Sequence, residues 1–305
     1  MRVLVIGSCA LDVYVEVEHL PKLSEDVNTK DLKMSLGGMA YNVYNVLSLF
    51  KRNAIFGCPV GKGIIANIIT SLLNEKGYQP IGIIPELDNG MCLCLVDNTG
   101  ERTFISHHGA EYRFNKELFK NVDMNEVDWI YFGGLEIEDV DGSKIVDFVS
   151  KQKANLFFAP GPRLDNIDEN LMKCIYALKP VLHINEREAS LITGEENLKA
   201  NAEKISSITN NTVIITLGKD GTLLKEIDKE PVIIPTKAVE MVDATGAGDN
   251  HAGAILACLN MGMDYVKAIR VANIISGYVV QQKGASLTEE NYQKALKDIK
   301  VIANI

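Results

Sequence analysis

Several features that mark other classes of protein are missing from this sequence. No apolar run in its 305 residues approaches the ~18 residues that a membrane-spanning helix needs. Lysine and arginine form no run longer than two, so the sequence gives no sign of a nucleic-acid-binding patch. The six cysteines include no C-x-x-C pair and the five histidines no H-x-x-x-H pair, which argues against a redox motif and a zinc site.

The amino-terminal segment also lacks the marks of a signal peptide. The apolar run in MRVLVIGSCALD has no basic region of any length before it and no small-residue cleavage site, and it ends at Asp12. We therefore expect a cytoplasmic protein with reduced thiols. The net charge of −9 gives no reason to expect nucleic acid or an anionic membrane as a partner, and a hydrophobic content of 47% is ample for a large core.

Short runs that are apolar throughout alternate with helical patterns along most of the chain. RVLVIG, WIYFGG and TVIITLG are such runs, and amphipathic patterns lie between or after them, for example at 141–152 and 264–282. Fully apolar strands are typical of a sheet that is buried on both faces. This alternation predicts an α/β fold of three layers, with helices on both sides of a mostly parallel central sheet.

Other segments alternate between apolar and polar residues and do not fit that sheet. Period-two alternation predicts strands with one exposed face. The segments lie at 11–17, 31–35, 91–97 and 102–107. We expect them to form a separate small β-sheet, inserted at about 11–36 and 89–109 into a single domain that spans 1–305.

The stretch MVDATGAGDNHAG, residues 241–253, places a cluster of small residues and an acid just before an apolar helix. Glycines at a helix start expose backbone N–H groups, and the helix dipole favours an anion there. Neither Gly-Lys pair continues as a P-loop, and the spacing of GAGDNHAG does not fit a dinucleotide fingerprint. These exclusions leave a phosphate cradle formed by Gly246, Ala247 and Gly248.

Asp249 lies inside that cradle, where a carboxylate would repel a bound phosphate. Its expected use is to accept the proton of an attacking hydroxyl while the backbone amides hold the transferred group. The pattern therefore indicates phosphoryl transfer. An ordinary acid in the first turn of a helix stays open as the simpler explanation of Asp249.

These motifs resemble those of the ribokinase-like, or PfkB, carbohydrate kinases, and the resemblance runs nearly end to end. The late D-T-T-G-A-G-D stretch of that family is matched by residues 243–249. Its G-G-x-x-x-N, N-x-x-E and T-x-G motifs are matched, in the same order, by Gly37, Gly38 and Asn42, by Asn185 and Glu188, and by Thr216 and Gly218. The resemblance implies a ribokinase-like fold, a β-sheet lid and ATP-dependent phosphorylation of a hydroxymethyl group on a small sugar.

The resemblance also implies a role for each matched residue. Asp249 is the expected base, with the backbone of Gly246, Ala247 and Gly248 as the anion hole. The acceptor is expected at Asp12, Gly37, Gly38 and Asn42, and ATP at Asn185, Thr216, Gly218 and Asn273. Glu188 is expected to act on Mg²⁺ through water, and Asp243 and Thr245 match positions near a loop that binds a monovalent cation such as K⁺. Homodimerisation through the lid is a further expectation.

Departures from the family pattern leave the acceptor open. Asn250 and His251 follow the base in place of a small residue and an aromatic one, and Glu111 replaces a usual asparagine. A nucleoside, such as pseudouridine or a purine nucleoside, is therefore the alternative acceptor. The lid residues that are candidates for selecting it are Arg102, Phe104, His107 and His108.

Simpler explanations also fit some of these residues when each is taken alone. Asp12 would fit an exposed position on a lid strand, Asn42 a helix surface, and the pair His107–His108 the surface at a strand end. A protein of another class, one that senses a sugar or nucleotide without turnover, is the third alternative. The retention of Asp249 and its glycines argues against it.

Overall fold

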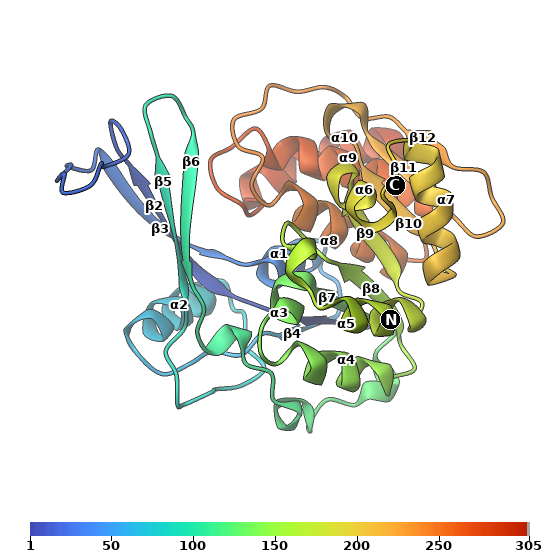
Figure 1. Ribbon diagram of the computed structural model, residues 1–305, viewed down its shortest axis with the longest axis horizontal. Helices are drawn as coiled ribbons and strands as arrows, with labels where there is room; N and C mark the ends of the chain where they lie inside the picture. The colour runs from blue at the N-terminus through green and yellow to red at the C-terminus, as the bar shows by residue number, and fades with distance from the viewer. Residues whose placement is uncertain (304–305) are drawn as a thin grey trace.

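Two β-sheets organise the protein, whose computed structural model describes residues 1–303 (Figure 1). Within these residues, eight strands form the larger sheet in the order β12–β11–β10–β9–β8–β7–β1–β4. They are β1 (Val3–Ile6), β4 (Ala54–Gly57), β7 (Trp129–Gly133), β8 (Asn155–Ala159), β9 (Val181–Asn185), β10 (Val213–Thr216), β11 (Thr222–Lys225) and β12 (Val232–Ile234).

The larger sheet is parallel from β4 to β10, and only its β11 and β12 end is antiparallel among the described strands. Parallel strands need long crossover connections, and helices supply them here. The described α-helices are α1 (Met39–Leu49), α2 (Ile64–Glu75), α3 (Gly134–Glu138), α4 (Gly142–Ser150), α5 (Glu169–Ala177), α6 (Glu186–Thr193), α7 (Leu198–Thr209), α8 (Ala247–Asn260), α9 (Tyr265–Val279) and α10 (Glu289–Ala303).

Both faces of the larger sheet are covered, as its apolar strands predict. Val3 and Val5 of β1 are fully buried in a core that also contains residues of α1, α8, α9 and α10. Leu4 and Ile6, which point to the other side, belong to a second core with α4, α5, α6 and α7. The three-layer α/β/α prediction is therefore confirmed.

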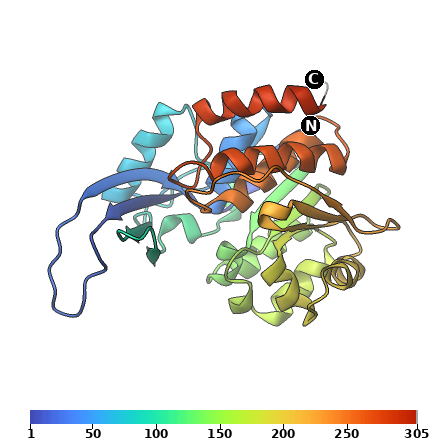
Figure 2. The same ribbon diagram turned by 90° about the horizontal axis from the view of Figure 1, so that it is seen from above.

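The smaller sheet is the predicted lid. Its strands are β2 (Ala10–Glu16), β3 (Asp31–Gly37), β5 (Met91–Val96) and β6 (Arg102–His107), in the order β3–β2–β5–β6. Val13 and Val15 of β2 pack with Ile69 and Leu73 of α2, so the opposite face of the lid is directed toward the larger sheet. Figure 2 shows the long connection between β2 and β3 extending away from the rest of the molecule.

Short helices fill the segments for which the sequence predicts no element. They are the 3₁₀ helices η1 (Ala110–Tyr112), η2 (Lys116–Phe119), η3 (Met124–Glu126), η4 (Leu164–Asn166) and η5 (Gly218–Asp220). Within residues 1–303, each helix is too short or too polar to cross a membrane.

Candidate active site

The start of α8 has the geometry that its glycines predict. Gly246 caps the helix with φ 73°, and a Cβ on it would lie 2.0 Å from the carbonyl oxygen of Ala285, so the site admits only glycine. A Cβ on Gly248 would meet no atom within 4 Å. The backbone N–H groups of Gly248 and Asp249 have no hydrogen-bond partner among the described residues. These amides are therefore free to bind an anion.

Asp249 lies in the first turn of α8, next to these amides. Its Oδ2 accepts a hydrogen bond of 2.9 Å from Nδ2 of Asn42 in α1. Burial, together with a smaller effect of the negative charge of Glu136, raises the pKa of Asp249 to about 7. The dipole of α8 favours the ionised carboxylate, but burial outweighs that effect in the structure. A pKa near neutrality suits a general base.

Asn42 contacts the expected base, and both polar atoms of its side-chain amide form hydrogen bonds within the protein. Its Nδ2 is bound to Asp249, and its Oδ1 accepts a hydrogen bond of 2.6 Å from Oγ of Ser286. The side chain is buried, so Asn42 is not an amide on a helix surface. Asn42 therefore orients Asp249, and Ser286, which no sequence motif indicates, orients Asn42.

Asp12 and the two early glycines lie together at the point where the lid meets α1. The carboxylate of Asp12 occupies the space next to Gly37, where a Cβ would lie 2.0 Å from Oδ2. Gly38 has φ 101° and is the N-cap of α1. Burial raises the pKa of Asp12 to about 7. The two glycines thus bring a partly buried carboxylate to the lid face that is directed toward α8.

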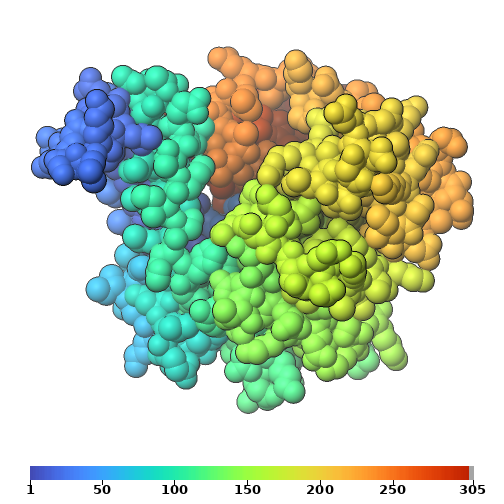
Figure 3. All heavy atoms as spheres, in the orientation of Figure 1, coloured from blue at the N-terminus to red at the C-terminus, as the bar shows by residue number. Residues whose placement is uncertain are grey.

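A cavity of about 360 Å³ separates the lid from the larger sheet. Figure 3 shows the hollow between the lid strands and the carboxy-terminal segment. Polar side chains that line it include Asp12, Asn42 and Asp249, and the lid contributes an apolar wall. The wall is formed by Tyr14, Met91, Cys92, Cys94 and Phe104. We refer to this cavity as the acceptor pocket.

A second cavity, of about 240 Å³, lies on the other side of the start of α8. It brings together Thr216, Gly218, Gly248 and Asn273, which the resemblance assigns to the nucleotide side or to the anion hole. Apolar side chains of Val239, Met241 and Val280 complete its lining. We refer to it as the nucleotide cavity. Gly246 and Asp249 line the acceptor pocket and Ala247 and Gly248 line the nucleotide cavity, so the start of α8 stands between the two.

Asn273 holds the wall of the nucleotide cavity through a buried network. Its Oδ1 lies 2.8 Å from Oγ1 of Thr222 and 3.0 Å from Nε2 of His251, and its Nδ2 donates to the carbonyl oxygen of Ile234. His251 in turn contacts His183 at 2.9 Å. Burial lowers the pKa of His251 to about 4, so the ring is neutral. The polar atoms of the Asn273 side chain therefore form hydrogen bonds within the protein.

Asn250, the other residue after the base that departs from the family pattern, has a structural role. Its Nδ2 donates to the carbonyl oxygens of Gly246 and Ala285, and its Oδ1 accepts from the backbone N–H of Leu287. The side chain is fully buried. It therefore ties the start of α8 to the segment that follows α9.

Asn185 and Glu188 form a capping box at the start of α6. The backbone N–H and Nδ2 of Asn185 donate to the two carboxylate oxygens of Glu188, at 3.0 and 2.8 Å. Glu188 is buried, and burial raises the pKa of its carboxyl. Because both oxygens already accept hydrogen bonds, these residues fit an Mg²⁺ ion that is reached through water better than a directly bound one. No group of three or more acidic, histidine or cysteine side chains within residues 1–303 could hold a metal.

Asp243 is buried, and its carboxylate holds two loops together. Oδ1 accepts from the backbone N–H of Thr245 at 2.9 Å, and Oδ2 accepts from that of Gly284 at 3.0 Å. Nη2 of Arg102, on the lid, lies 3.4 Å from Oδ2. The charge of Asp243 is therefore already balanced by a side chain, and a monovalent cation bound to this carboxylate does not fit beside the guanidinium.

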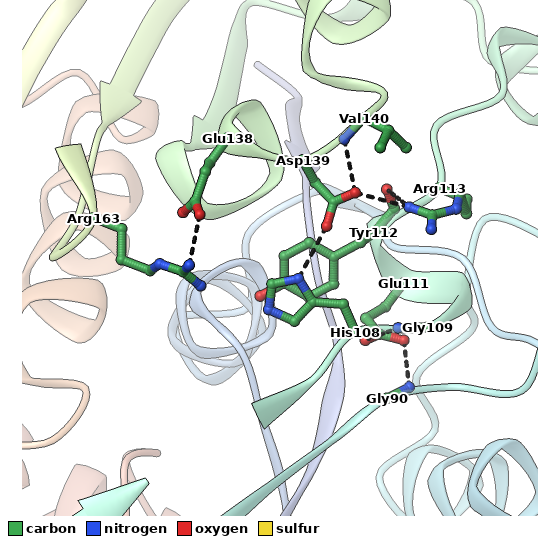
Figure 4. Close-up of polar contacts among 10 residues, drawn as sticks. All are labelled: Gly90, His108, Gly109, Glu111, Tyr112, Arg113, Glu138, Asp139, Val140 and Arg163. Atoms are coloured by element: carbon green, nitrogen blue, oxygen red, sulfur yellow. Dashed lines mark hydrogen bonds and ion pairs between the residues drawn. The ribbon is translucent and has the colours of Figure 1, made fainter. Parts of the chain in front are cut away.

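The lid residue His108 is fixed against the wall of the acceptor pocket (Figure 4). Its ring stacks on Tyr112 with ring centroids 3.7 Å apart, and its Nδ1 lies 3.0 Å from Oδ2 of Asp139. Arg113 donates to the other oxygen of Asp139 at 2.9 Å. His108 is therefore held in place, unlike the exposed strand-end side chain of the simpler explanation, whereas His107 is exposed.

Glu111, which replaces the usual asparagine, is buried and binds the backbone (Figure 4). Its carboxylate accepts hydrogen bonds from the N–H groups of Gly90 and Gly109, at 2.7 and 3.0 Å. These glycines lie just before β5 and just after β6. Glu111 therefore fixes the base of the β5–β6 hairpin, although it also lines the acceptor pocket.

One buried carboxylate near the site is not indicated by any sequence motif. Glu136 of α3 accepts a hydrogen bond of 2.8 Å from the backbone N–H of Ser8, and its charge acts on Asp249. It comes from the segment GGLEIE, in which neither spacing nor composition distinguishes it. Only the tertiary fold brings it to Ser8, which lines the acceptor pocket.

Comparisons with known proteins agree with this geometry. The pfkB family carbohydrate kinase profile matches residues 1–291. An uncharacterized sugar kinase of Escherichia coli K12, YegV, is 29% identical over 304 residues, which cover 97% of this chain and 94% of the relative. Ribokinase of Mus musculus is 26% identical over 303 residues, covering 95% and 91%.

Solved structures share the fold at lower sequence identity. Ribokinase from Thermotoga maritima superposes with a TM-score of 0.82 at 23% identity, covering 97% of this chain and 99% of that one. Ribokinase from Arabidopsis thaliana, complexed with ribose and ATP, gives 0.76 at 21%, covering 97% and 98%. A Burkholderia thailandensis nucleoside kinase in complex with inosine gives 0.79 at 18%, covering 100% and 99%.

The structural neighbours establish the fold, and the family profile spans nearly the whole chain. Both agree with the motif order along the sequence and with the position of α8 between two cavities. The chain therefore belongs to the PfkB family of carbohydrate kinases.

Proposed function

We propose that this protein transfers the γ-phosphate of ATP to a hydroxymethyl group of a small sugar. The start of α8, with free amides and an acid between two cavities, is the observation that supports this most directly. A donor in one cavity and an acceptor in the other would meet at Gly248 and Asp249. Phosphoryl transfer requires mainly this positioning and the stabilisation of charge.

In the proposed mechanism, Asp249 takes the proton of the acceptor hydroxyl as that oxygen attacks the γ-phosphorus, while the bond from this phosphorus to the β–γ bridging oxygen breaks and ADP leaves. Asn42 holds the carboxylate in place through its 2.9 Å hydrogen bond. The amides of Gly248 and Asp249 stabilise the charge that develops on the transferred group. Asp12 binds acceptor hydroxyls on the lid side of the pocket. Mg²⁺, when bound near Glu188 through water, would neutralise phosphate charge.

A nucleoside is the second candidate acceptor, and the apolar wall of the acceptor pocket favours it. Tyr14, Phe104 and the sulfur-containing side chains of β5 offer a surface on which a flat base would pack. The hydroxyls of a free sugar would find few partners on that wall. In this alternative the 5′-hydroxymethyl group occupies the same position beside Asp249.

The acceptor is tested by ATP consumption over a panel of pentoses, hexoses and nucleosides, with the product identified by mass spectrometry. The Asp249→Asn variant, purified in the same way, controls for contaminating kinases. A sugar product supports the main proposal and a nucleoside product supports the second. Binding of ATP and an acceptor without turnover would instead support a sensing protein.

The assembly and location of the protein are proposals of the same kind. Leu32, Met34 and Ile105 of the edge strands β3 and β6 are about half exposed, and an open sheet edge with apolar residues favours pairing. We infer that two copies of the protein form a homodimer through the lid. We also infer that the protein lies in the cytoplasm, where ATP is available, and that residues 1–305 act as one kinase domain. Sedimentation of the wild type and of Ile105→Glu tests the dimer, since the variant should sediment as a monomer.

A further inference from the structure

Asp243 is a buried acid whose position controls the loop before α8. Its side chain is 1% exposed, and its oxygens hold the backbone N–H groups of Thr245 and Gly284. Thr245 is followed directly by Gly246, the cap of α8. A carboxylate buried to this degree is costly unless it has a partner of opposite charge.

That partner comes from the lid. Arg102 begins β6 and pairs with Val96 of β5. Its side chain is 23% exposed, and its Nη2 lies 3.4 Å from Oδ2 of Asp243 and donates a 3.3 Å hydrogen bond to the carbonyl oxygen of Val242. Arg102 thus crosses from the smaller sheet to the loop that leads into the anion hole.

Arg102 does not line the acceptor pocket, but it closes the pocket's edge. Phe104, two residues further along β6, lines the pocket from the lid, and Thr245 and Gly246 line it from the other side. The ion pair therefore lies where the two walls meet.

We propose that Arg102 is a positioning residue: from the lid it supplies the positive charge beside Asp243, in place of the monovalent cation expected there. The inference rests on the proposed kinase function. Its consequence is that the loop from Asp243 to Gly246 has its counter-charge only while the lid is closed. The phosphate-binding amides are therefore fully ordered only after the lid has covered the acceptor.

A second ion pair between the lid and the body provides a matched control. Lys283 pairs with Glu16 of β2, but the lysine is 66% exposed and the glutamate 34%. Exposed pairs contribute little, because water and salt screen them. Lys283→Ala also removes a positive charge from a lid–body contact, so it should leave turnover and lid protection close to those of the wild type.

Turnover is measured in buffer free of sodium and potassium, with choline chloride to match the ionic strength. Added KCl should change wild-type kcat by less than about twofold under these conditions. Arg102→Ala should lower kcat by about 10- to 100-fold, the range for loss of a hydrogen bond to a charged group. Guanidinium or K⁺ at millimolar concentration should restore part of that loss, and Arg102→Lys should retain more activity than the alanine variant.

Hydrogen exchange of the β5 and β6 amides gives a readout that does not depend on catalysis. Arg102→Ala should increase exchange in these strands and at Thr245, whereas Lys283→Ala should not. The inference is wrong if the wild type requires K⁺ for turnover. It is also wrong if Arg102→Ala keeps the kcat and the lid protection of the wild type. If the wild type phosphorylates no acceptor, the proposed function fails, while the exchange experiment still tests Arg102. A circular dichroism spectrum shows that each variant is folded.

Discussion

Asn42 in the first turn of α1 donates a hydrogen bond of 2.9 Å to Asp249 in the first turn of α8. The two residues are 207 positions apart in the sequence, and the contact joins the early glycine motif to the late one. It orients the expected base toward the acceptor pocket. It also stabilises the ionised form of a carboxylate whose pKa burial raises to about 7.

Replacing Asp249 by asparagine tests the base directly. The amide keeps the shape of the side chain but cannot accept the proton of the acceptor. We expect kcat to fall by about 10²- to 10⁴-fold, the usual cost of losing a general base, while ATP and acceptor bind nearly as before. Steady-state kinetics and calorimetric titration measure both quantities. A kcat within about threefold of the wild type would make Asp249 a structural residue of the helix start.

The pH dependence of turnover follows from the raised pKa of Asp249. Catalysis requires the ionised carboxylate, so activity is present above the pKa of about 7 and is lost as the pH falls through it. Asp12, whose pKa is also about 7, adds a second protonation. We expect log kcat/KM for the acceptor to rise with a slope of about one to two below pH 7 and to level off above it. A flat profile from pH 5 to 8 would contradict the assignment.

Asp12 and Asn42 should differ when each is replaced by alanine. Asp12 faces the acceptor pocket, so its loss should raise the acceptor KM more than it lowers kcat. Asn42 is bound to the base, so its loss should lower kcat and move the acidic limb of the pH profile upward by about one unit. Equal effects of both variants on KM alone would instead place Asn42 with the acceptor.

Gly248 should separate activity from stability. A Cβ there meets no protein atom within 4 Å but would project beside the free amides of the anion hole. Alanine is about 1 kcal/mol better than glycine in a helix, so Gly248→Ala should keep or raise the free energy of unfolding. Its kcat should fall, and Gly248→Val should lose nearly all activity. Thermal unfolding and turnover are measured on the same samples, and full activity in the valine variant would place the anion hole elsewhere.

Glu188→Gln tests the role of this residue toward magnesium. The neutral side chain should raise the Mg²⁺ concentration needed for half-maximal activity more than it raises the acceptor KM. It also disturbs the capping box, which costs about 1 kcal/mol of stability. Glu186→Gln, at an exposed position in the same helix turn, removes the same charge but no hydrogen bond of the capping box, so it serves as the control. An unchanged Mg²⁺ dependence would leave Glu188 with the capping role alone.

The sequence predicted features that depend on neighbouring residues and missed those that join distant ones. The burial of Val13 and Val15 follows from period two, and the open helix start follows from Gly246 and Gly248. The pairing of Arg102 with Asp243 depends on how the lid folds over the larger sheet, and no local pattern encodes it. Asn273 does line the expected cavity, but its amide is occupied by Thr222 and His251, which only the packing shows.

The strand pairing sets an order in which the chain can fold. β1, at residues 3–6, lies between β4 and β7, so one of its neighbours is not synthesised until residue 133. α1 packs against α8, and Asn45 of α1 donates to the carbonyl oxygen of Leu287. Contacts between residues that are so far apart in the sequence form late, and they slow folding. On the ribosome, β1 therefore waits for β7, and α1 waits until residue 260 for the whole of α8, a period in which chaperones would protect these apolar segments from aggregation.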